Sequence, residues 1–317
     1  MALALFHSPE EWAAQFAASR RGSVLTIGNF DGMHLGHQAI LRSVVERASS
    51  LGAVATALTF DPPPLKVLRP ESAPPRISTN EQRAEWFRAL GLEAAVVWRF
   101  DKELAQISPE DFVRNILVSP LQLRAILAGE NFCFGRNHAG DVPLLRVLGS
   151  QLGFAVEIVP PVRVRGRVVS STTVRHTVAD GKVNEARHLL GRPFVLSGEI
   201  HPGTGIGRQL VVPTLNLVPE QELLPALGVY ATETTVAGRM HLSVTNVGRR
   251  PTFSGPALSI ESHLFDFSAE LTRGPMEIRF WKRLREEKRF PGPAELRAQI
   301  ARDIARARRY FTRRPSR

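Results

Sequence analysis

The sequence predicts an α/β fold, in which a parallel-sheet, Rossmann-like domain is followed by a small antiparallel β-barrel domain with a C-terminal helix. Two patterns predict it. Up to about residue 190, continuous apolar runs alternate with stretches of helical periodicity, which is typical of parallel strands covered by helices on both faces. Beyond Gly191, short alternating runs are separated by turns, which is typical of a small barrel. We therefore expect domains at residues 1–188 and 189–317.

The first half contains strand and helix signals in alternation. Apolar runs predict strands at 23–27, 53–60, 94–98, 124–128 and 155–159. Apolar residues in 38–45 recur at helical spacing and predict a helix after the first strand. Ser78 and Glu81 form a capping box that predicts the start of another helix, which Gly91 ends. Pro109, followed by two acidic residues, predicts a further helix start.

The second half contains short strands and one long helix. Alternating patterns predict strands at 194–200, 229–236, 240–244, 260–267 and 276–283. An amphipathic pattern predicts a helix at 293–311. No low-complexity linker separates the halves, so we expect a compact junction near residues 188–194.

Composition places the chain among ordinary globular proteins. Its 317 residues are enough for two cored domains, and 43% hydrophobic and 22% charged residues are typical of that class. No apolar run approaches the about 18 residues of a membrane span, and the N-terminus lacks the pattern of a secretory signal. A single cysteine excludes an internal disulfide and fits a reducing compartment, so we expect a cytoplasmic protein.

The charge balance is strongly basic, with a net charge of +11, which suits nucleic acids or polyphosphate substrates. Much of the charge is carried by arginines near the C-terminus, where a solvated helix face is the ordinary explanation. No zinc finger, aromatic RNA-binding motif or helix-turn-helix pattern accompanies it. We therefore expect neither a nucleic-acid nor a membrane partner.

The ten residues from Gly28 to His37 are the most informative stretch of the first half. They join the predicted strand 23–27 to the helix that follows, where open α/β sheets bind ligands because helix N-terminal N–H groups favour anions. Glycine lets a phosphate approach the backbone, and the imidazoles of His34 and His37 can donate hydrogen bonds to phosphoryl oxygens. The alternatives are a plain tight turn and a metal site, but Cys133 is remote in sequence and no third ligand has metal-site spacing.

Polar groups also mark the ends of other predicted elements in the first half. Asn131 comes shortly after the predicted strand 124–128. Three hydroxyl residues, 170–172, open a helix and are followed by Arg175 one turn later. A single hydroxyl there normally only caps a helix, whereas three hydroxyls with a guanidinium form a cradle for phosphate.

The second half carries a glycine-rich loop, a polar strand and a carboxylate among apolar neighbours. Backbone N–H groups of the loop 203–208 can hold nucleotide phosphates. Thr214 and Asn216 alternate on one strand face, and their oxygens suit a hard cation such as Mg²⁺; the alternative is a strand entry with turn residues. Glu261 is either paired structurally or reactive.

Together these motifs resemble those of the bacterial bifunctional riboflavin kinase/FAD synthetase family, whose first domain is an HxGH nucleotidyltransferase. The resemblance spans about residues 6–311, and both motif sets occur in the family's order. Two departures stand out: Pro63 replaces a usual His, and Val211 and Val212 replace a usual Gly-Phe. The resemblance implies a parallel-sheet nucleotidyltransferase domain followed by a riboflavin kinase barrel.

The implied function is bifunctional flavin-cofactor synthesis. Riboflavin and ATP give FMN in residues 189–317, and FMN and ATP give FAD with release of pyrophosphate in residues 1–188. Riboflavin, FMN, FAD and ATP are therefore the implied ligands, with Mg²⁺ as cofactor. We expect a monomer or a weak homo-oligomer.

The resemblance also assigns roles to individual residues. The implied catalytic residues are His34, His37, Asn131, Arg175 and Glu261. The implied ATP- and phosphate-binding residues are Gly28, Asn29, Phe30, Asp31, Gly32, Gly36, Ser170, Ser171, Thr172, Gly203, Gly205, Gly207 and Arg208. The implied flavin-binding residues are Asn131, Arg285 and Arg289. The implied metal ligands are Thr214 and Asn216. Among them, Glu261 is the implied general base for the 5′-hydroxyl of riboflavin.

Three rival functions remain open. One is another nucleotidyltransferase of the same superfamily, against which the Pro-Thr-x-Asn and Glu-Ser-His-Leu strings of the second half argue. Another is a nucleic-acid-binding protein that uses the basic C-terminus, which salt-dependent retention on DNA would reveal. The third is a flavin-binding protein that has lost one activity through the departures at Pro63 or Val211 and Val212.

Overall fold

The chain forms two compact units that interleave along the sequence. The structure is a computed structural model that describes residues 3–19, 21–202, 213–252, 255–269, 271–288 and 290–313. The first unit consists of residues 1–74 and 78–170, and the second of residues 75–77 and 171–317. The predicted division of the two activities after residue 188 stays a prediction; in the structure, the residues 171–188 cluster with the second unit.

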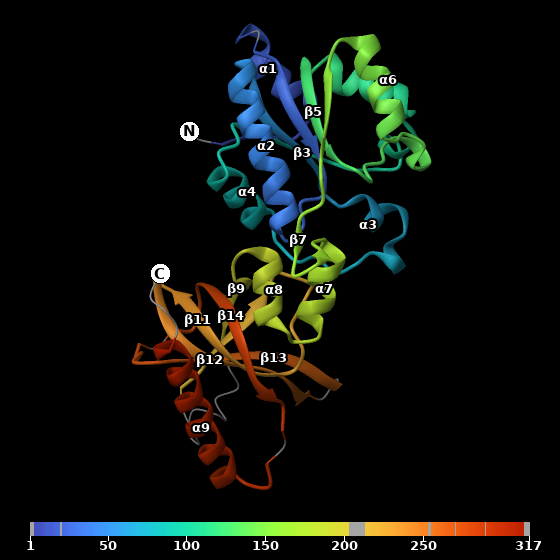
Figure 1. Cartoon of the computed structure of the whole chain (residues 1–317). Coiled ribbons are helices and arrows are strands. Elements are labelled where there is room, and N and C mark those ends of the chain that lie inside the picture. Colours follow the sequence, from blue (N-terminus) through green and yellow to red (C-terminus); the bar gives the residue numbers. More distant parts are fainter. Residues whose placement is uncertain are drawn as a thin grey trace. The chain divides into compact units, whose positions relative to one another are not determined.

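A parallel sheet forms the centre of the first unit (Figure 1). Its strands are β1 (Ala4–Phe6), β2 (Ser23–Ile27), β3 (Val54–Phe60), β4 (Ala94–Trp98), β5 (Leu123–Gly129) and β6 (Ala155–Val159). They are hydrogen-bonded in the order β1-β4-β3-β2-β5-β6, and every neighbouring pair is parallel. The predicted parallel sheet is therefore confirmed, and β1 is an edge strand that the sequence patterns did not predict.

Helices and short connecting elements join these strands. The helices are α1 (Pro9–Phe16), α2 (Leu35–Leu51), α3 (Pro64–Leu68), α4 (Asn80–Ala89), α5 (Pro109–Asp111), the π-helix η4 (Phe112–Val118) and α6 (Val142–Leu152). The 3-10 turns are η1 (Ala17–Ser19), η2 (Pro70–Ser72), η3 (Leu104–Gln106) and η5 (Arg136–His138). A small hairpin, β7 (Arg163–Val164) and β8 (Arg167–Val168), comes before the end of the unit.

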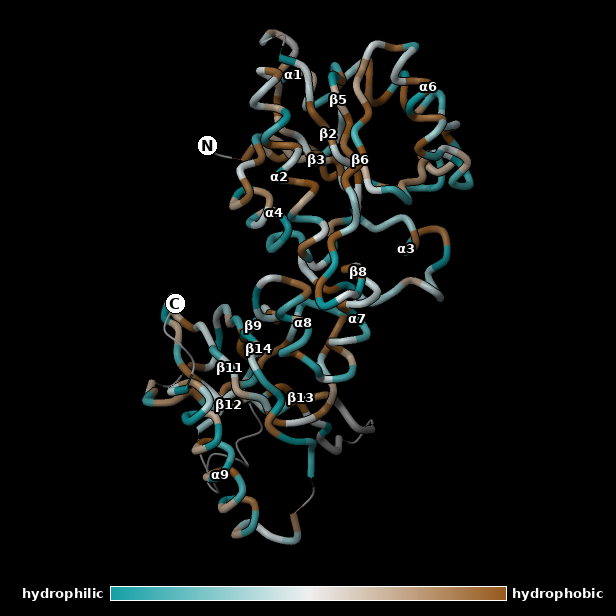
Figure 2. Tube along the Cα trace, in the orientation of Figure 1, coloured by the Kyte–Doolittle hydropathy of each residue, from teal (hydrophilic) through white to brown (hydrophobic). Residues whose placement is uncertain are grey.

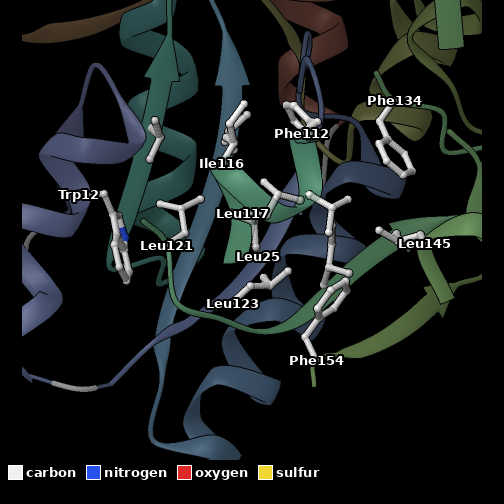
Figure 3. Close-up of a cluster of buried hydrophobic side chains, with 14 of the residues drawn as sticks. Trp12, Leu25, Phe112, Ile116, Leu117, Leu121, Leu123, Phe134, Leu145 and Phe154 are labelled. Carbon is white, nitrogen blue, oxygen red and sulfur yellow. The ribbon is translucent and has the colours of Figure 1, made fainter. Parts of the chain in front are cut away.

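The two faces of the sheet are packed differently. On one face, small side chains such as Ala55 and Ala125 let α2 approach closely through Val44 and Ala48. On the other, α1, η4 and α6 bury a larger apolar cluster that includes Trp12 (Figure 3). Because strands alternate their side chains, a strand that is apolar throughout supplies both faces at once.

The predicted capping box of α4 is shifted by one residue. Thr79, not Ser78, is the N-cap: its hydroxyl accepts from Gln82 N, and the Gln82 side chain accepts from Thr79 N. The Ser78 hydroxyl bonds instead to Asp31 and Gly32. A partner 47 residues away in sequence is not visible in a local pattern.

A closed antiparallel barrel forms the second unit, as the sequence predicts (Figure 1). Its strands are β9 (Phe194–His201), β10 (Leu215–Pro219), β11 (Gly228–Val236), β12 (Arg239–Thr252), β13 (Gly255–Leu264) and β14 (Pro275–Glu286). Its helices are α7 (Ser171–Ala179), α8 (Val183–Leu190) and α9 (Pro293–Thr312). The strands are ordered β10-β13-β12-β11-β14-β9 around the barrel. The predicted strand 260–267 ends at Leu264, because Asp266 adopts a positive φ of 55° in the turn that follows.

Hydroxyl groups fill part of the barrel interior. Five side chains with no exposed surface hydrogen-bond to one another at 2.7–3.0 Å, namely Thr232, Thr234, Ser243, Thr245 and Ser262. They come from the neighbouring strands β11, β12 and β13. We call these five residues the hydroxyl cluster. Since each member hydrogen-bonds to other members, and the Ser243 hydroxyl also bonds to Thr232 O, burying them costs little.

Helix α9 covers the outside of the barrel. Ala307 of α9 is buried with Val229, Ala231 and Val244, which lie on β11 and β12. Figure 2 shows hydrophobic positions recurring along α9 between hydrophilic ones, as expected of a helix with one packed face. Within the described ranges, no helix is both long and apolar enough to span a membrane.

Candidate functional site

The predicted phosphate-binding loop lies where the strand order of the sheet reverses. The chain passes from β2 to β3 and β4 on one side, and β5 and β6 lie on the other. The carboxyl ends of β2 and β5 are thus neighbours, which is where open α/β sheets bind ligands. The loop from Gly28 follows β2, and Asn131 follows β5 and is exposed.

Two histidines are brought together at the N-terminus of α2. His34 is the N-cap, and its Nδ1 accepts a hydrogen bond from His37 N at 3.2 Å. The two imidazole rings stack with centroids 3.6 Å apart. Gly36 lies close to the first ring: a Cβ there would be 3.1 Å from the His34 ring, which would have to shift slightly. A proton cannot occupy the accepting Nδ1, so His34 presents Nε2–H as its donor.

The loop before His34 has an unusual backbone. Phe30, Gly32 and Met33 have positive φ values of 47°, 80° and 40°. The side chains of Phe30 and Met33 are buried in the core with Leu41 and Phe87, so Phe30 can meet a ligand only through its backbone. Asp31 is 8% exposed, and its Oδ1 accepts from both the N–H and the hydroxyl of Ser78.

Arg83, a residue absent from the predicted site, supports the same loop. Its buried guanidinium donates to Asn29 O at 3.0 Å and to Thr59 Oγ1 at 2.9 Å. It also bonds to Asn80 Oδ1. Neither Arg83 nor Ser78 forms part of a sequence motif near the loop, so only their contacts reveal them.

The predicted phosphate cradle divides between the two units. Ser170 is the last residue of the first unit, whereas Ser171, Thr172 and Arg175 begin the second on α7. Within the second unit, Arg175 Nε donates to Pro75 O at 2.8 Å. Of this set, Ser170 and Ser171 are half-buried and Thr172 is exposed.

In the barrel, one row of paired residues brings the other predicted residues together. The row contains His201, Asn216, Glu261, Asn246, Val229 and Arg285, each on a different strand. Paired residues share a face of a sheet, and Val229 packs with α9, so the row faces outward from the barrel. Glu261 thus lies directly between Asn216 and Asn246, a residue that we did not predict in the site.

Polar atoms surround Glu261 on this outer face. Glu261 is half-buried, and its Oε1 accepts from the Ser259 hydroxyl at 2.9 Å. Thr214 lies one residue before β10 begins. Nearby in the register, Glu287 Oε1 accepts from Arg249 N at 3.2 Å.

The Glu287 carboxylate lies close to Gly248, two residues beyond Asn246. A Cβ on Gly248 would come within 2.4 Å of Glu287 Oε1, so the Glu287 side chain would have to move to make room for it. Among the residues that the structure describes, no three His, Cys, Asp or Glu side chains gather as a metal site.

Arg285 is held by a buried ion pair. Its guanidinium bonds to Asp303 of α9 at 2.8–2.9 Å, and the two side chains are 15% and 5% exposed. Another nitrogen of the group donates to Glu286 O at 2.8 Å. The predicted residues Gly203, Gly205, Gly207, Arg208 and Arg289 lie outside the described residues, as do Val211 and Val212.

Two family models match the chain in series. The FAD synthetase model matches residues 16–173, and the riboflavin kinase model matches residues 190–311. The bifunctional riboflavin kinase/FMN adenylyltransferase of Escherichia coli K12 is 35% identical over 93% of this chain and 94% of its own length. That of Pseudomonas fluorescens is 38% identical over 91% and 93%. The chain belongs to this bifunctional family.

The family confirms the predicted order of an FAD synthetase domain followed by a riboflavin kinase domain. The first matched range contains His34, His37 and Asn131, and the second contains Asn216 and Glu261. A solved structure titled as a macrolide-efflux protein from Streptococcus pneumoniae has the same fold, with a TM-score of 0.84 at 24% identity. The alignment covers 97% of this chain and 99% of that one.

Proposed function

We propose that this chain makes both flavin cofactors in two separate sites. The barrel phosphorylates riboflavin with ATP to give FMN and ADP, and the sheet domain joins FMN to the AMP part of ATP to give FAD and pyrophosphate. The observation that carries the proposal is the tandem match of the two family models: one covers His34, His37 and Asn131, and the other covers Asn216 and Glu261.

In the adenylylation site, the chemistry is positioning and charge stabilisation. An oxygen of the FMN phosphate attacks the α-phosphorus of ATP, and the bond to the pyrophosphate oxygen breaks. Nε2–H of His34 and the imidazole of His37 would donate to the phosphate oxygens as negative charge builds on them. N–H groups at the start of α2 add to this field, because a helix N-terminus favours anions.

The family resemblance names further donors for this reaction. By that resemblance, the hydroxyls of Ser170, Ser171 and Thr172 and the guanidinium of Arg175 would hold the triphosphate. Asn131, at the end of the neighbouring strand, would contact the reacting phosphates or the flavin.

The single exposed cysteine, Cys133, fits a reducing compartment such as the cytoplasm.

In the barrel site, Glu261 would act as the general base. The 5′-hydroxyl of riboflavin attacks the γ-phosphorus of ATP, its proton passes to a Glu261 oxygen, and the bond to the ADP oxygen breaks. Oε1 of Glu261 accepts from Ser259, which fixes the carboxylate on the outer face of β13. Arg285 would support the flavin side only through the helix that it holds, since Asp303 occupies its guanidinium.

The residues beside Glu261 fit a magnesium ion. The Thr214 hydroxyl and the Asn216 amide oxygen are hard donors, and Asn216 pairs in register with Glu261. Magnesium usually takes few protein ligands and completes its shell with phosphate oxygens and water, which agrees with the lack of a carboxylate cluster among the described residues. When bound, it would neutralise charge on the ATP phosphates.

The experiment is a product analysis with the purified full chain. Incubation with riboflavin, ATP and Mg²⁺ should give FMN first and FAD later, separated by chromatography. A His37→Ala variant should stop at FMN, with FAD formation slowed by roughly 10²–10³ because a charge-stabilising donor is lost. FAD at the parent rate from that variant would remove His37 from the proposed site.

A further inference from the structure

The turn before His34 adopts a conformation that needs support from outside the loop. Three of its four residues from Phe30 to Met33 have positive φ, and two of these are not glycine. Backbone of this kind persists only where the surroundings hold it. Phe30 and Met33 are fixed by core packing, which leaves the Asp31–Gly32 peptide between them to be held by polar contacts.

Ser78 supplies those contacts with one hydroxyl. Its Oγ donates to Asp31 Oδ1 at 3.0 Å and accepts from Gly32 N at 3.0 Å, so one oxygen bonds both to the N–H of this peptide and to the side chain of the residue before it. Its backbone N–H also donates to Asp31 Oδ1, at 3.0 Å. Ser78 is 1% exposed and Asp31 is 8% exposed, so water does not replace these bonds readily.

The position of Ser78 is itself well determined. The next residue, Thr79, is the N-cap of α4 and forms a complete capping box with Gln82. Arg83, one turn into α4, holds Asn29 O on the other side of the strained turn. The start of α4 therefore holds the loop at two points: Arg83 bonds to Asn29, and Ser78 bonds to Asp31 and Gly32 within the turn that leads into His34.

We propose that Ser78 is a positioning residue for FMN adenylylation. It acts through Asp31 and Gly32, by fixing the turn that places His34 and the first N–H groups of α2 against the ATP phosphates. The inference rests on the proposed function of this loop. Without the hydroxyl, Gly32 N–H loses this acceptor, and the turn can relax toward less strained backbone. A displacement of the order of 1 Å at a reacting group costs about a hundredfold in rate.

The test uses three single variants of the full chain. Ser78→Ala removes the hydroxyl, and Ser78→Thr keeps it. Ser72→Ala is the matched control, because Ser72 is an exposed serine of the same connecting segment whose hydroxyl bonds only locally, to Arg69 O. Steady-state FAD formation from FMN and ATP is measured beside FMN formation from riboflavin and ATP in each preparation, together with the melting temperature.

We expect Ser78→Ala to lower kcat for adenylylation by about ten- to a hundredfold, while riboflavin phosphorylation by the same molecules stays within twofold of the parent. Ser78→Thr should recover most of kcat, and Ser72→Ala should match the parent in both reactions. Adenylylation within twofold of the parent in Ser78→Ala, an equal loss of both activities, or no recovery in Ser78→Thr would overturn the proposal. A parent that forms no FAD would instead overturn the proposed function.

Discussion

Glu261 illustrates how one residue is fixed by its register in a strand. The residues on either side of it, Ile260 and Ser262, are buried in the barrel, so the alternation of β13 turns Glu261 to the outer face. There the neighbouring strands place Asn216 and Asn246 beside it. A carboxylate whose register neighbours are amides suits the role of a proton acceptor.

We predict that Glu261→Gln folds, binds riboflavin and ATP, and still converts supplied FMN to FAD. It should form FMN slower by on the order of 10²–10⁴, because the amide keeps the shape of the side chain but cannot take a proton. Rapid-quench assays of FMN formation, with riboflavin binding followed by flavin fluorescence, measure both properties. A melting temperature well below that of the parent, or FMN formation at the parent rate, would show that Glu261 is a structural residue.

Tyr230 links the stability of the barrel to alkaline pH. Burial raises the pKa of its phenol to about 12, more than the nearby Arg283 lowers it. Because the folded-state pKa lies above the ordinary value of about 10, the unfolded chain releases this proton first. The stabilisation is therefore fully present below about pH 10 and is lost as pH rises toward 12, to a total on the order of 2–3 kcal/mol.

We predict that the free energy of unfolding falls less in a Tyr230→Phe variant than in the parent as the pH rises from about 10 toward 12. Urea unfolding at about pH 9 and about pH 11.5 measures the difference. Arg192, whose pKa burial lowers to about 10, contributes a slope of opposite sign, but it does so in both proteins and cancels in the comparison. If the free energy of unfolding changed by the same amount between the two pH values in parent and variant, the Tyr230 phenol would not carry the predicted pKa shift.

At the scale of the element, the N-terminus of α2 depends on its glycine. The Cβ of an alanine at residue 36 would lie 3.1–3.2 Å from the His34 ring and 3.5 Å from Val169 O, so the ring must move. We predict that Gly36→Ala lowers the rate of adenylylation at least tenfold, through displacement of His34. Riboflavin phosphorylation should be unchanged. Ser50→Ala, at the exposed far end of α2, is the control, and steady-state kinetics of both reactions decide. FAD formation at the parent rate would mean that the ring position is not critical.

The elements also show what a sequence pattern contains and what it lacks. β2 and β4 lie where their apolar runs predict, because burial on both faces leaves an uninterrupted signal. β12 extends far beyond the predicted 240–244, since its outer face carries polar residues such as Asn246 that break the apolar alternation. The local pattern predicts Ser78 as a helix cap, because its partner Asp31 is distant in sequence and leaves no local signal.

The site residues divide in the same way. The two histidines and Gly36 are adjacent in sequence, so their motif predicts that they act together. The pairing of Glu261 with Asn216 and Asn246 depends on the register of three strands, which turn lengths and bulges set and which a motif does not encode. The family resemblance identifies Glu261 as a site residue. The strand register adds that Asn216 and Asn246 are paired with it.

For the whole molecule, the separation into two units predicts separable activities. We predict that a chain starting at Ser171 phosphorylates riboflavin and forms no FAD. A chain starting at residue 189 should have a free energy of unfolding at least about 2–4 kcal/mol lower than the chain starting at Ser171, because it lacks the buried residues Val183 and Ala186 of α8. It also loses Arg187, which lies over the Trp281 ring at 5.3 Å. Denaturant unfolding and kinase assays of both chains measure this. Equal stability, or a folded but inactive longer chain, would contradict the division.

The hydroxyl cluster inside the barrel has a consequence for how such a sequence can change over time. Replacing any one member, such as Ser262, with an apolar residue leaves the neighbouring hydroxyls without one of their partners and costs about 1–3 kcal/mol, whereas replacing all five together leaves no hydroxyl of the cluster behind. A sequence that changes by single substitutions must therefore pass through variants that are destabilised by that amount. Among diverged descendants of this chain, these five positions should therefore be inherited as a block, retained or exchanged jointly.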